Sequence, residues 1–96
     1  MKRFEVSRRA LRDLDEILDF IAERSPDAAD RVLEDFHRVF RQLAQDPEIG
    51  HRRQDLTSRD VLFWRVHSYL VIYRDSTPLR IVRIIHGRRD VSKLLK

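Results

Sequence analysis

The apolar residues in the first half of the chain are spaced as in two amphipathic helices. Ser7 is a good N-cap, and after it apolar residues recur at intervals of three and four. These residues are Ala10, Leu11, Leu14, Ile17, Leu18 and Ile21. Ser25 and Pro26 suit the cap and the first position of a second helix, whose apolar stripe extends from Ala29 to Leu43. Because the connection between them is so short, the two helices are predicted to pack as an antiparallel hairpin.

From Val61 onward the apolar pattern has a period of two, which is typical of β-strands. Three stretches are rich in β-branched and aromatic residues and are separated by short turn sequences: 61–67, 69–74 and 79–86. They are predicted to form an antiparallel meander, and residues 2–6 are predicted to form a further short strand. The order β-α-α-β-β-β predicts an α+β fold, in which the helical hairpin packs on a small antiparallel sheet.

The segments outside these elements are polar or short. Residues 45–60 are predicted to form an irregular loop, and Asp90 is predicted to cap a last short turn at 91–96. Neither face of the predicted sheet is cleanly polar, since Arg65 falls on the same face as Phe63. We therefore expect the helices to cover one face and a partner to cover at least part of the other.

The composition is that of one charged domain, spanning residues 1–96. The chain is 42% hydrophobic and 38% charged, and it contains no cysteine. It therefore has neither a disulfide framework nor a thiolate metal site, and its four histidines lack the spacing of a carboxylate-backed metal site. No apolar run approaches the length of a membrane span. We expect a cytoplasmic protein without a metal or other cofactor and without a membrane partner.

Charge is distributed unevenly along the chain. Residues 1–50 contain nine Lys or Arg and twelve Asp or Glu, a net charge of −3. Residues 51–96 contain eleven Lys or Arg and four Asp or Glu, a net charge of +7. This division indicates that the second half contacts an anionic partner, either nucleic acid or an acidic protein segment. The alternative is that the basic residues only solvate one face. The same two interpretations apply to the segment GHRR at 50–53, as a loop that binds phosphate or as a solvated loop.

Several segments, in their order and spacing, resemble the ParE branch of the RelE/ParE toxins from bacterial toxin–antitoxin pairs. The similarity covers nearly the whole chain and is carried by VSRRALRDLDEILDFIAERSPDAA (6–29), LAQDPEIGHRRQDL (43–56), FWRVHSYLVIYR (63–74) and IVRIIHGRRD (81–90). The resemblance implies a RelE/ParE-like fold and a cytoplasmic toxin that forms a hetero-oligomer with a cognate antitoxin. That antitoxin would wrap a partly acidic segment over the basic side of the toxin.

The resemblance leaves two mechanisms open, because RelE-like members are ribosome-dependent endoribonucleases whereas ParE-like members bind DNA gyrase. Cleavage of RNA requires a base, an acid and fixed positive charge at the phosphate. The residues suited to these roles are His86, Arg83, Arg65 and Tyr73. Nothing in the sequence places the other histidines near His86.

His86 also has a structural interpretation. It precedes Gly87, which would permit the backbone turn that ends the strand, and an imidazole there can bond to the turn and pack on an aromatic ring. The residues His86, Gly87, Arg89 and Asp90 resemble the closing motif of ParE. We therefore favour a structural or binding role for His86 over a catalytic one.

The leading interpretation is a toxin that binds the A subunit of DNA gyrase and has no catalytic residue of its own. The residues expected to contact gyrase or the antitoxin are Arg65, Arg83, His86, Arg88, Arg89, Lys93, Leu94, Leu95 and Lys96. One alternative is an mRNA endoribonuclease that uses His86 and Arg83. A further alternative is a non-toxic module that binds nucleic acid, which would bind DNA or RNA with steep salt dependence.

Overall fold

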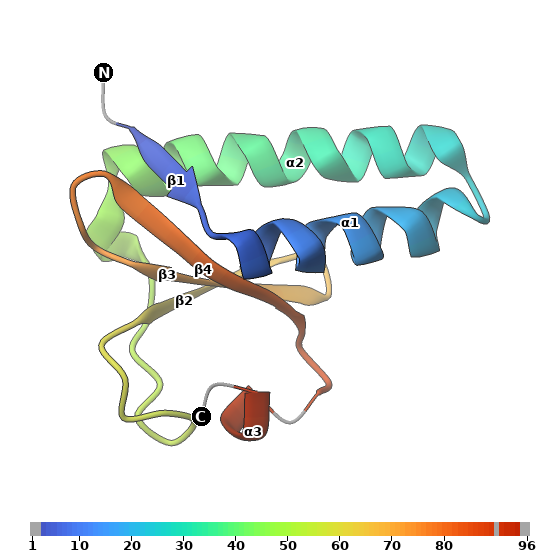
Figure 1. Ribbon diagram of the computed structural model, residues 1–96. Helices are drawn as coiled ribbons and strands as arrows, with labels where there is room; N and C mark the ends of the chain where they lie inside the picture. The colour runs from blue at the N-terminus through green and yellow to red at the C-terminus, as the bar shows by residue number, and fades with distance from the viewer. Residues whose placement is uncertain (1–2, 90, 95–96) are drawn as a thin grey trace.

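A helical hairpin lies across one face of a four-stranded sheet in the computed structural model, which describes residues 3–89 and 91–94 (Figure 1). In chain order the elements are strand β1 (Phe4–Val6), helices α1 (Arg8–Ala22) and α2 (Pro26–Gln45), the 3₁₀ turn η1 (Pro47–Ile49), strands β2 (Leu62–Val66), β3 (Tyr69–Arg74) and β4 (Leu79–His86), and the short helix α3 (Val91–Leu94). The predicted element order and the α+β class are confirmed. None of the helices in the described part of the chain is both long and apolar enough to cross a membrane.

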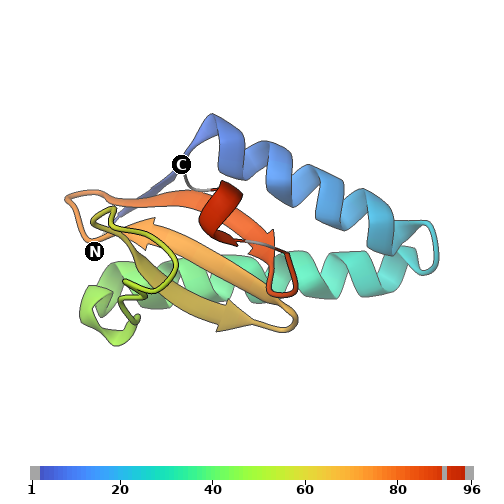
Figure 2. The ribbon, with the colours of Figure 1, turned by 90° about the horizontal axis from the view of Figure 1, so that it is seen from below.

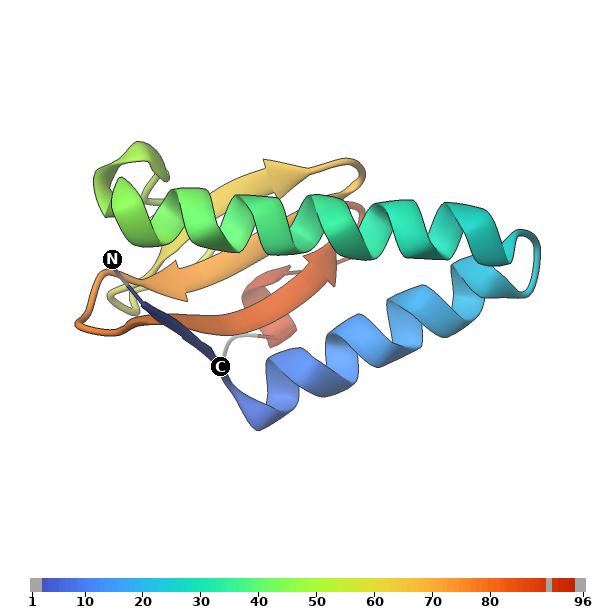
Figure 3. The ribbon, with the colours of Figure 1, turned by 90° about the horizontal axis from the view of Figure 1, so that it is seen from above.

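Both long helices begin at the residues that the sequence predicts. The Ser7 hydroxyl accepts a hydrogen bond from the Ala10 N–H at 3.0 Å, and the Ser25 hydroxyl accepts one from the Ala28 N–H at 3.1 Å. Each serine thereby satisfies one of the N–H groups that have no partner within the first turn of a helix. Viewed from above, the two helices run antiparallel over the sheet, and their connected ends extend past it (Figure 3).

The sheet has the strand order β1-β4-β3-β2. The pairs β2–β3 and β3–β4 are antiparallel, as the predicted meander requires. β1 pairs in parallel with β4, with Phe4 opposite Leu79 and Val6 opposite Ile81, so the complete sheet is mixed. The β3–β4 register shifts between Ile72 and Tyr73: Ile72 pairs with Arg83, but Tyr73 pairs with Ile81, so the pairing skips Val82.

Each face of the sheet has its own apolar cluster. The larger cluster lies between the sheet and the helical hairpin and includes Phe36, Phe40 and Leu43, which are fully buried. The opposite face carries a smaller cluster, which we call the lower cluster: Val61, Phe63, Ile72, Ile85 and Val91, with Leu56, Leu70 and Val82 partly buried against it.

The chain itself covers part of the lower face. Val91 lies in α3, on the side of the sheet opposite to the hairpin, and Leu56 lies in the long loop before β2 (Figure 2). The chain thus supplies part of the cover of this face through Leu56 and Val91, which the sequence did not predict, and the expectation that a partner covers part of it stays a prediction. The predicted cap Asp90 lies outside the described residues.

Candidate functional site

The turn that follows β4 is closed by three hydrogen bonds. The Gly87 N–H donates to Ser68 O at 2.8 Å, the Arg89 N–H donates to His86 O at 3.0 Å, and the Arg88 N–H donates to His86 Nδ1 at 3.1 Å. The His86 ring also packs edge-to-face on Tyr69, with ring centroids 5.3 Å apart. An Nδ1 that accepts a hydrogen bond leaves the proton of the neutral ring on Nε2. The imidazole therefore has the two structural contacts expected for it: the turn and an aromatic ring.

Gly87 lies where two turns approach each other closely, whereas the sequence suggested that it supplies backbone freedom. None of the described glycines has a positive φ. A Cβ on Gly87 would lie 3.3 Å from Ser68 O and 3.4 Å from an Arg65 guanidinium nitrogen, which is closer than most Cβ contacts. The prediction of a glycine-dependent turn is thus corrected to a close approach between two turns. The positive φ of this region belongs instead to His67, at 55°.

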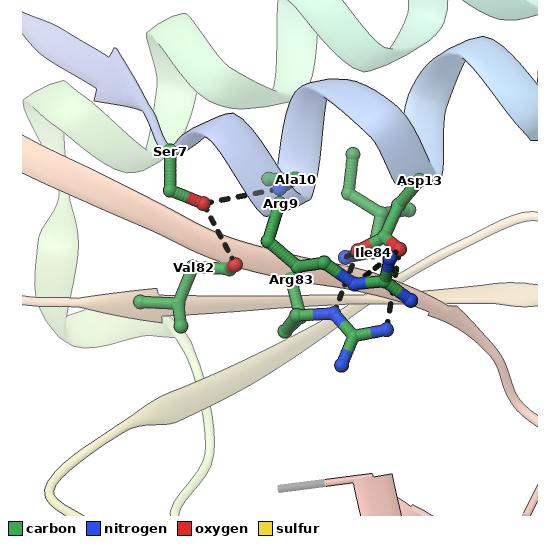
Figure 4. A network of polar contacts seen from close by, with 7 residues as sticks. All are labelled: Ser7, Arg9, Ala10, Asp13, Val82, Arg83 and Ile84. Carbon is green, nitrogen blue, oxygen red and sulfur yellow. Dashed lines mark hydrogen bonds and ion pairs between the residues drawn. The ribbon is translucent and has the colours of Figure 1, made fainter.

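Arg83 is held in a nearly buried ion pair (Figure 4). Its Nε lies 2.8 Å from Asp13 Oδ2 and its Nη2 lies 3.2 Å from Asp13 Oδ1, so the guanidinium binds the carboxylate with two nitrogens. Only 9% of Arg83 and 5% of Asp13 is exposed. Arg83 was expected to contact a partner or an RNA phosphate; in this arrangement its charge is directed at α1.

Side chains from the N-cap and first turns of α1 bond to backbone groups of β4 beyond the point where its pairing with β1 ends. The Ser7 hydroxyl donates to Val82 O at 2.9 Å, and Asp13 Oδ2 accepts the Ile84 N–H at 3.0 Å (Figure 4). Arg9 Nε lies 3.6 Å from Asp13 Oδ1. Side chains of α1 thus satisfy backbone groups that a neighbouring strand would otherwise bond.

Tyr73 is also occupied by the fold. Its side chain is fully buried, and its hydroxyl donates to Pro47 O at 2.7 Å and accepts the Gly50 N–H at 2.9 Å. Burial raises the pKa of the phenol above its ordinary value. The Tyr73 hydroxyl therefore connects β3 to the η1 turn. Because it is buried and both donates and accepts a hydrogen bond within the fold, it is not placed to exchange protons with a substrate.

Of the four residues suited to RNA cleavage, Arg83 and Tyr73 are occupied by contacts within the fold, whereas the Arg65 guanidinium approaches Gly87, next to His86. His86 pairs with Tyr69, which pairs with Val66, so His86 lies on the helical side of the sheet. Arg65 is paired across β3 with Ile85 and lies on the lower face. Tyr73 is four positions along β3 from Tyr69, a separation of roughly 13 Å along a strand.

Four exposed basic residues lie on the segments around the end of β4. Arg65 reaches Gly87 from β2, Arg88 and Arg89 follow β4, and Lys93 is on α3. We call these four residues the basic end. Of the other residues expected to make contacts, Leu95 and Lys96 lie outside the described residues, and Leu94 is described only as part of the α3 backbone.

A second histidine contact was not predicted. His67 Nε2 lies 2.7 Å from Asp35 Oδ2, which links the β2–β3 turn to α2, and Arg38 bonds the other carboxylate oxygen. The pKa of Asp35 is lowered, chiefly by the hydrogen bond with His67, while burial opposes this shift and Arg38 adds to it. No local signal in the sequence links residues so far apart.

Comparison with known proteins gives consistent results. Residues 4–91 match the family model described as "ParE toxin of type II toxin-antitoxin system, parDE". The chain is 31% identical over 94 residues to "Putative toxin Y4kP" of Sinorhizobium fredii, covering 98% of this chain and 97% of that protein. It is 32% identical over 74 residues to "Toxin RelE3" of Caulobacter vibrioides, covering 77% and 80%.

A solved structure shares the fold. It is described as "Chromosomal ParDE TA system from P. aeruginosa" and superposes with a TM-score of 0.72 at 22% identity, covering 90% of this chain and 96% of that one.

Proposed function

Because this chain belongs to the ParE toxin family of type II toxin–antitoxin systems, we propose that it arrests growth by binding DNA gyrase. In this proposal the toxin binds the gyrase A subunit, traps the enzyme with cleaved DNA and blocks replication. A cognate antitoxin in the cytoplasm forms a hetero-oligomer with the toxin and neutralises it. The toxin acts by contact alone and needs no cofactor.

The observation that carries this proposal is that Arg83 and Tyr73, two of the four residues suited to RNA cleavage, are occupied by contacts within the fold. Arg83 is paired with Asp13, and Tyr73 is fully buried. The strand register places His86 and Arg65 on opposite faces of the sheet, and the Arg65 guanidinium approaches His86 only at the turn formed by Gly87. Proton transfer requires the acid, the base and the charged group to lie around one reacting phosphate. A protein that acts by binding has no such requirement, so this arrangement favours contact over cleavage.

The basic end is the surface that we assign to the partner contact. Its arginines are exposed, and Arg88 and Arg89 follow Gly87, which backbone hydrogen bonds hold against the β2–β3 turn and which the Arg65 guanidinium approaches. Arginine binds carboxylates through two nitrogens at once, which suits an acidic segment of an antitoxin. Residues 93–96, with two leucines between lysines, extend the same region in sequence.

The test is a gyrase supercoiling reaction with ATP and the purified chain. Inhibition with accumulation of cleaved DNA is the expected result. The double variant Arg88→Gln/Arg89→Gln should weaken inhibition or antitoxin binding at least tenfold. Its matched control, Arg8→Gln/Arg12→Gln, removes two exposed charges from α1 and should leave both activities unchanged. Full gyrase activity in the presence of protein that still arrests growth would contradict the proposal.

The alternative activity is a ribosome-dependent endoribonuclease, which the name of the Caulobacter relative favours. It would require His86 as the proton-transferring group without Tyr73, which is buried. Sequencing of transcript ends after induction distinguishes the two activities, because an endoribonuclease produces cut messenger RNA and a gyrase poison produces cut DNA.

A further inference from the structure

The loop that leads into β2 is fixed to the sheet at several points. His51 and Phe63 exchange two backbone hydrogen bonds, of 2.9 and 2.8 Å, so the start of the loop adds a short bridge to the edge of β2. Leu56 packs against the lower cluster, and Val61 at the end of the loop is buried. We call residues 51–61 the arginine loop (Figure 2). Its backbone is attached at its beginning, middle and end, so its polar side chains project from a fixed base.

Three arginines of this loop line one hollow of about 420 Å³. They are Arg52, Arg53 and Arg59, and the hydroxyls of Thr57 and Ser58 line the same space together with the carboxylate of Asp60. These six side chains carry a net charge of +2. Guanidinium groups bind phosphate oxygens in pairs, and hydroxyl groups donate to the remaining oxygens. The lining therefore has the chemistry of a phosphate site.

Arg52 and Arg53 each form an ion pair with an aspartate. Arg52 pairs with Asp60, and Arg53 pairs with both oxygens of Asp55, at 3.0 and 2.8 Å. Asp60 is 87% exposed and Arg52 is 58% exposed, and exposed ion pairs of this kind contribute little stability. A backbone phosphate, which carries one charge over two non-bridging oxygens, can accept hydrogen bonds from two guanidinium groups at once and displace Asp60 from Arg52.

A second hollow of about 450 Å³ adjoins the first and shares Arg52 and Asp60 with it. It adds Arg74, from the end of β3, together with Asp75 and Ser76, so its charged side chains alone balance. The two hollows together are lined by four arginines and two aspartates, a net charge of +2. Adjoining sites that share one arginine suit consecutive phosphates of a chain.

We propose that the arginine loop is a phosphate-binding site and that its ligand is the backbone of a nucleic acid. The site lies at the start of β2, whereas the basic end lies at the end of β4. It does not depend on the identity of the toxin's target, because the loop binds the polyanion directly. Two adjoining hollows that share Arg52 favour a chain with consecutive phosphates over free phosphate.

The test is a fluorescence anisotropy titration with a labelled oligonucleotide of about 20 residues, single-stranded and as a duplex, at salt concentrations between about 50 and 200 mM. No gyrase or antitoxin is present, so the result does not depend on the function proposed above. The variant Arg52→Gln/Arg53→Gln/Arg59→Gln should bind at least tenfold more weakly. Its slope of log affinity against log salt should decrease by about two to three, roughly one for each lost phosphate contact. The matched control Arg8→Gln/Arg12→Gln/Arg41→Gln removes the same charge from the helices and should behave as the wild-type chain.

Amide chemical shifts of the wild-type chain provide a readout that needs no variant. Addition of the oligonucleotide should shift signals of the arginine loop and of Arg74, more than those of the helices. If pyrophosphate shifts the same signals and the oligonucleotide binds no more tightly than pyrophosphate, the ligand is free phosphate and not a nucleic acid. An unchanged loop, equal binding by the loop variant, or equally tight binding of an acidic peptide would overturn the proposal.

Discussion

Asp13 and Arg83 join α1 to β4 through an ion pair that is almost entirely excluded from solvent. The carboxylate contacts two guanidinium nitrogens and also accepts the Ile84 N–H, so one side chain neutralises a charge and closes a strand edge. Removing one partner of such a pair leaves the other charge buried without compensation, which destabilises more than the intact pair stabilises.

Substitution of Asp13 is therefore expected to be costly. The variant Asp13→Asn keeps an oxygen that can accept the Ile84 N–H but removes the negative charge that Asp13 places against the nearly buried Arg83, and it should lower the free energy of unfolding by about 3 kcal/mol. Urea unfolding followed by circular dichroism measures the change. The control Asp15→Asn removes an exposed carboxylate from the same helix and should change stability by less than about 0.5 kcal/mol. Equal effects of the two substitutions would contradict this role of Asp13.

The position of Asp13 could have been anticipated from the sequence. It follows Ala10 by three residues and precedes Ile17 by four, so it lies beside the apolar stripe of α1. An acid at that edge of a buried face indicates a basic partner in the interior. The sequence could not identify Arg83 as that partner, because the strand pattern gives the face of a residue and not what it contacts.

Gly50 and Gly87 are expected to respond differently to the same substitution. A Cβ on Gly50 would lie 2.2 Å from Tyr73 Oη and 2.8 Å from two ring carbons, so Gly50→Ala must displace a fully buried ring. The closest approach at Gly87 is 3.3 Å. We expect Gly50→Ala to destabilise by about 2–3 kcal/mol and Gly87→Ala by about 1 kcal/mol or less. Thermal unfolding gives the order, and a reversed order would show that Tyr73 is not held as described.

Local sequence patterns predicted the helices and strands. Long-range contacts determined the pairing of β1 and the cover of the lower face, which no local pattern predicts. The caps at Ser7 and Ser25 and the alternation of the strands depend on neighbours in sequence, so they were predicted correctly. The parallel pairing of β1 with β4 brings together the two ends of the chain, and no local signal encodes it. Leu56 and Val91 are apolar residues without a surrounding period, which is why their cover of the lower face was not predicted.

The contact between Asp35 and His67 predicts a pH dependence of stability. The pKa of Asp35 is lowered in the folded chain, so its contribution is present above the unfolded pKa, about 3.9, and is lost as pH falls through the lowered value. Asp35→Asn should therefore flatten the acid limb of a plot of unfolding free energy against pH. Asp30→Asn, an exposed change on the same helix, should leave that limb unchanged. NMR titration should show the Asp35 pKa rising towards its ordinary value in His67→Ala.

His86 is the residue whose substitution separates a binding role from catalysis most directly. Asparagine carries an oxygen at the same number of bonds from the backbone as His86 Nδ1, so His86→Asn can still accept the Arg88 N–H. It loses the ring contact with Tyr69, about 1 kcal/mol, and all acid–base capacity near neutral pH. We expect His86→Asn to retain growth arrest and gyrase inhibition, and His86→Ala to weaken both because the turn loses its acceptor. Loss of activity in a folded His86→Asn variant, accompanied by loss of transcript cleavage, would instead identify His86 as a catalytic residue.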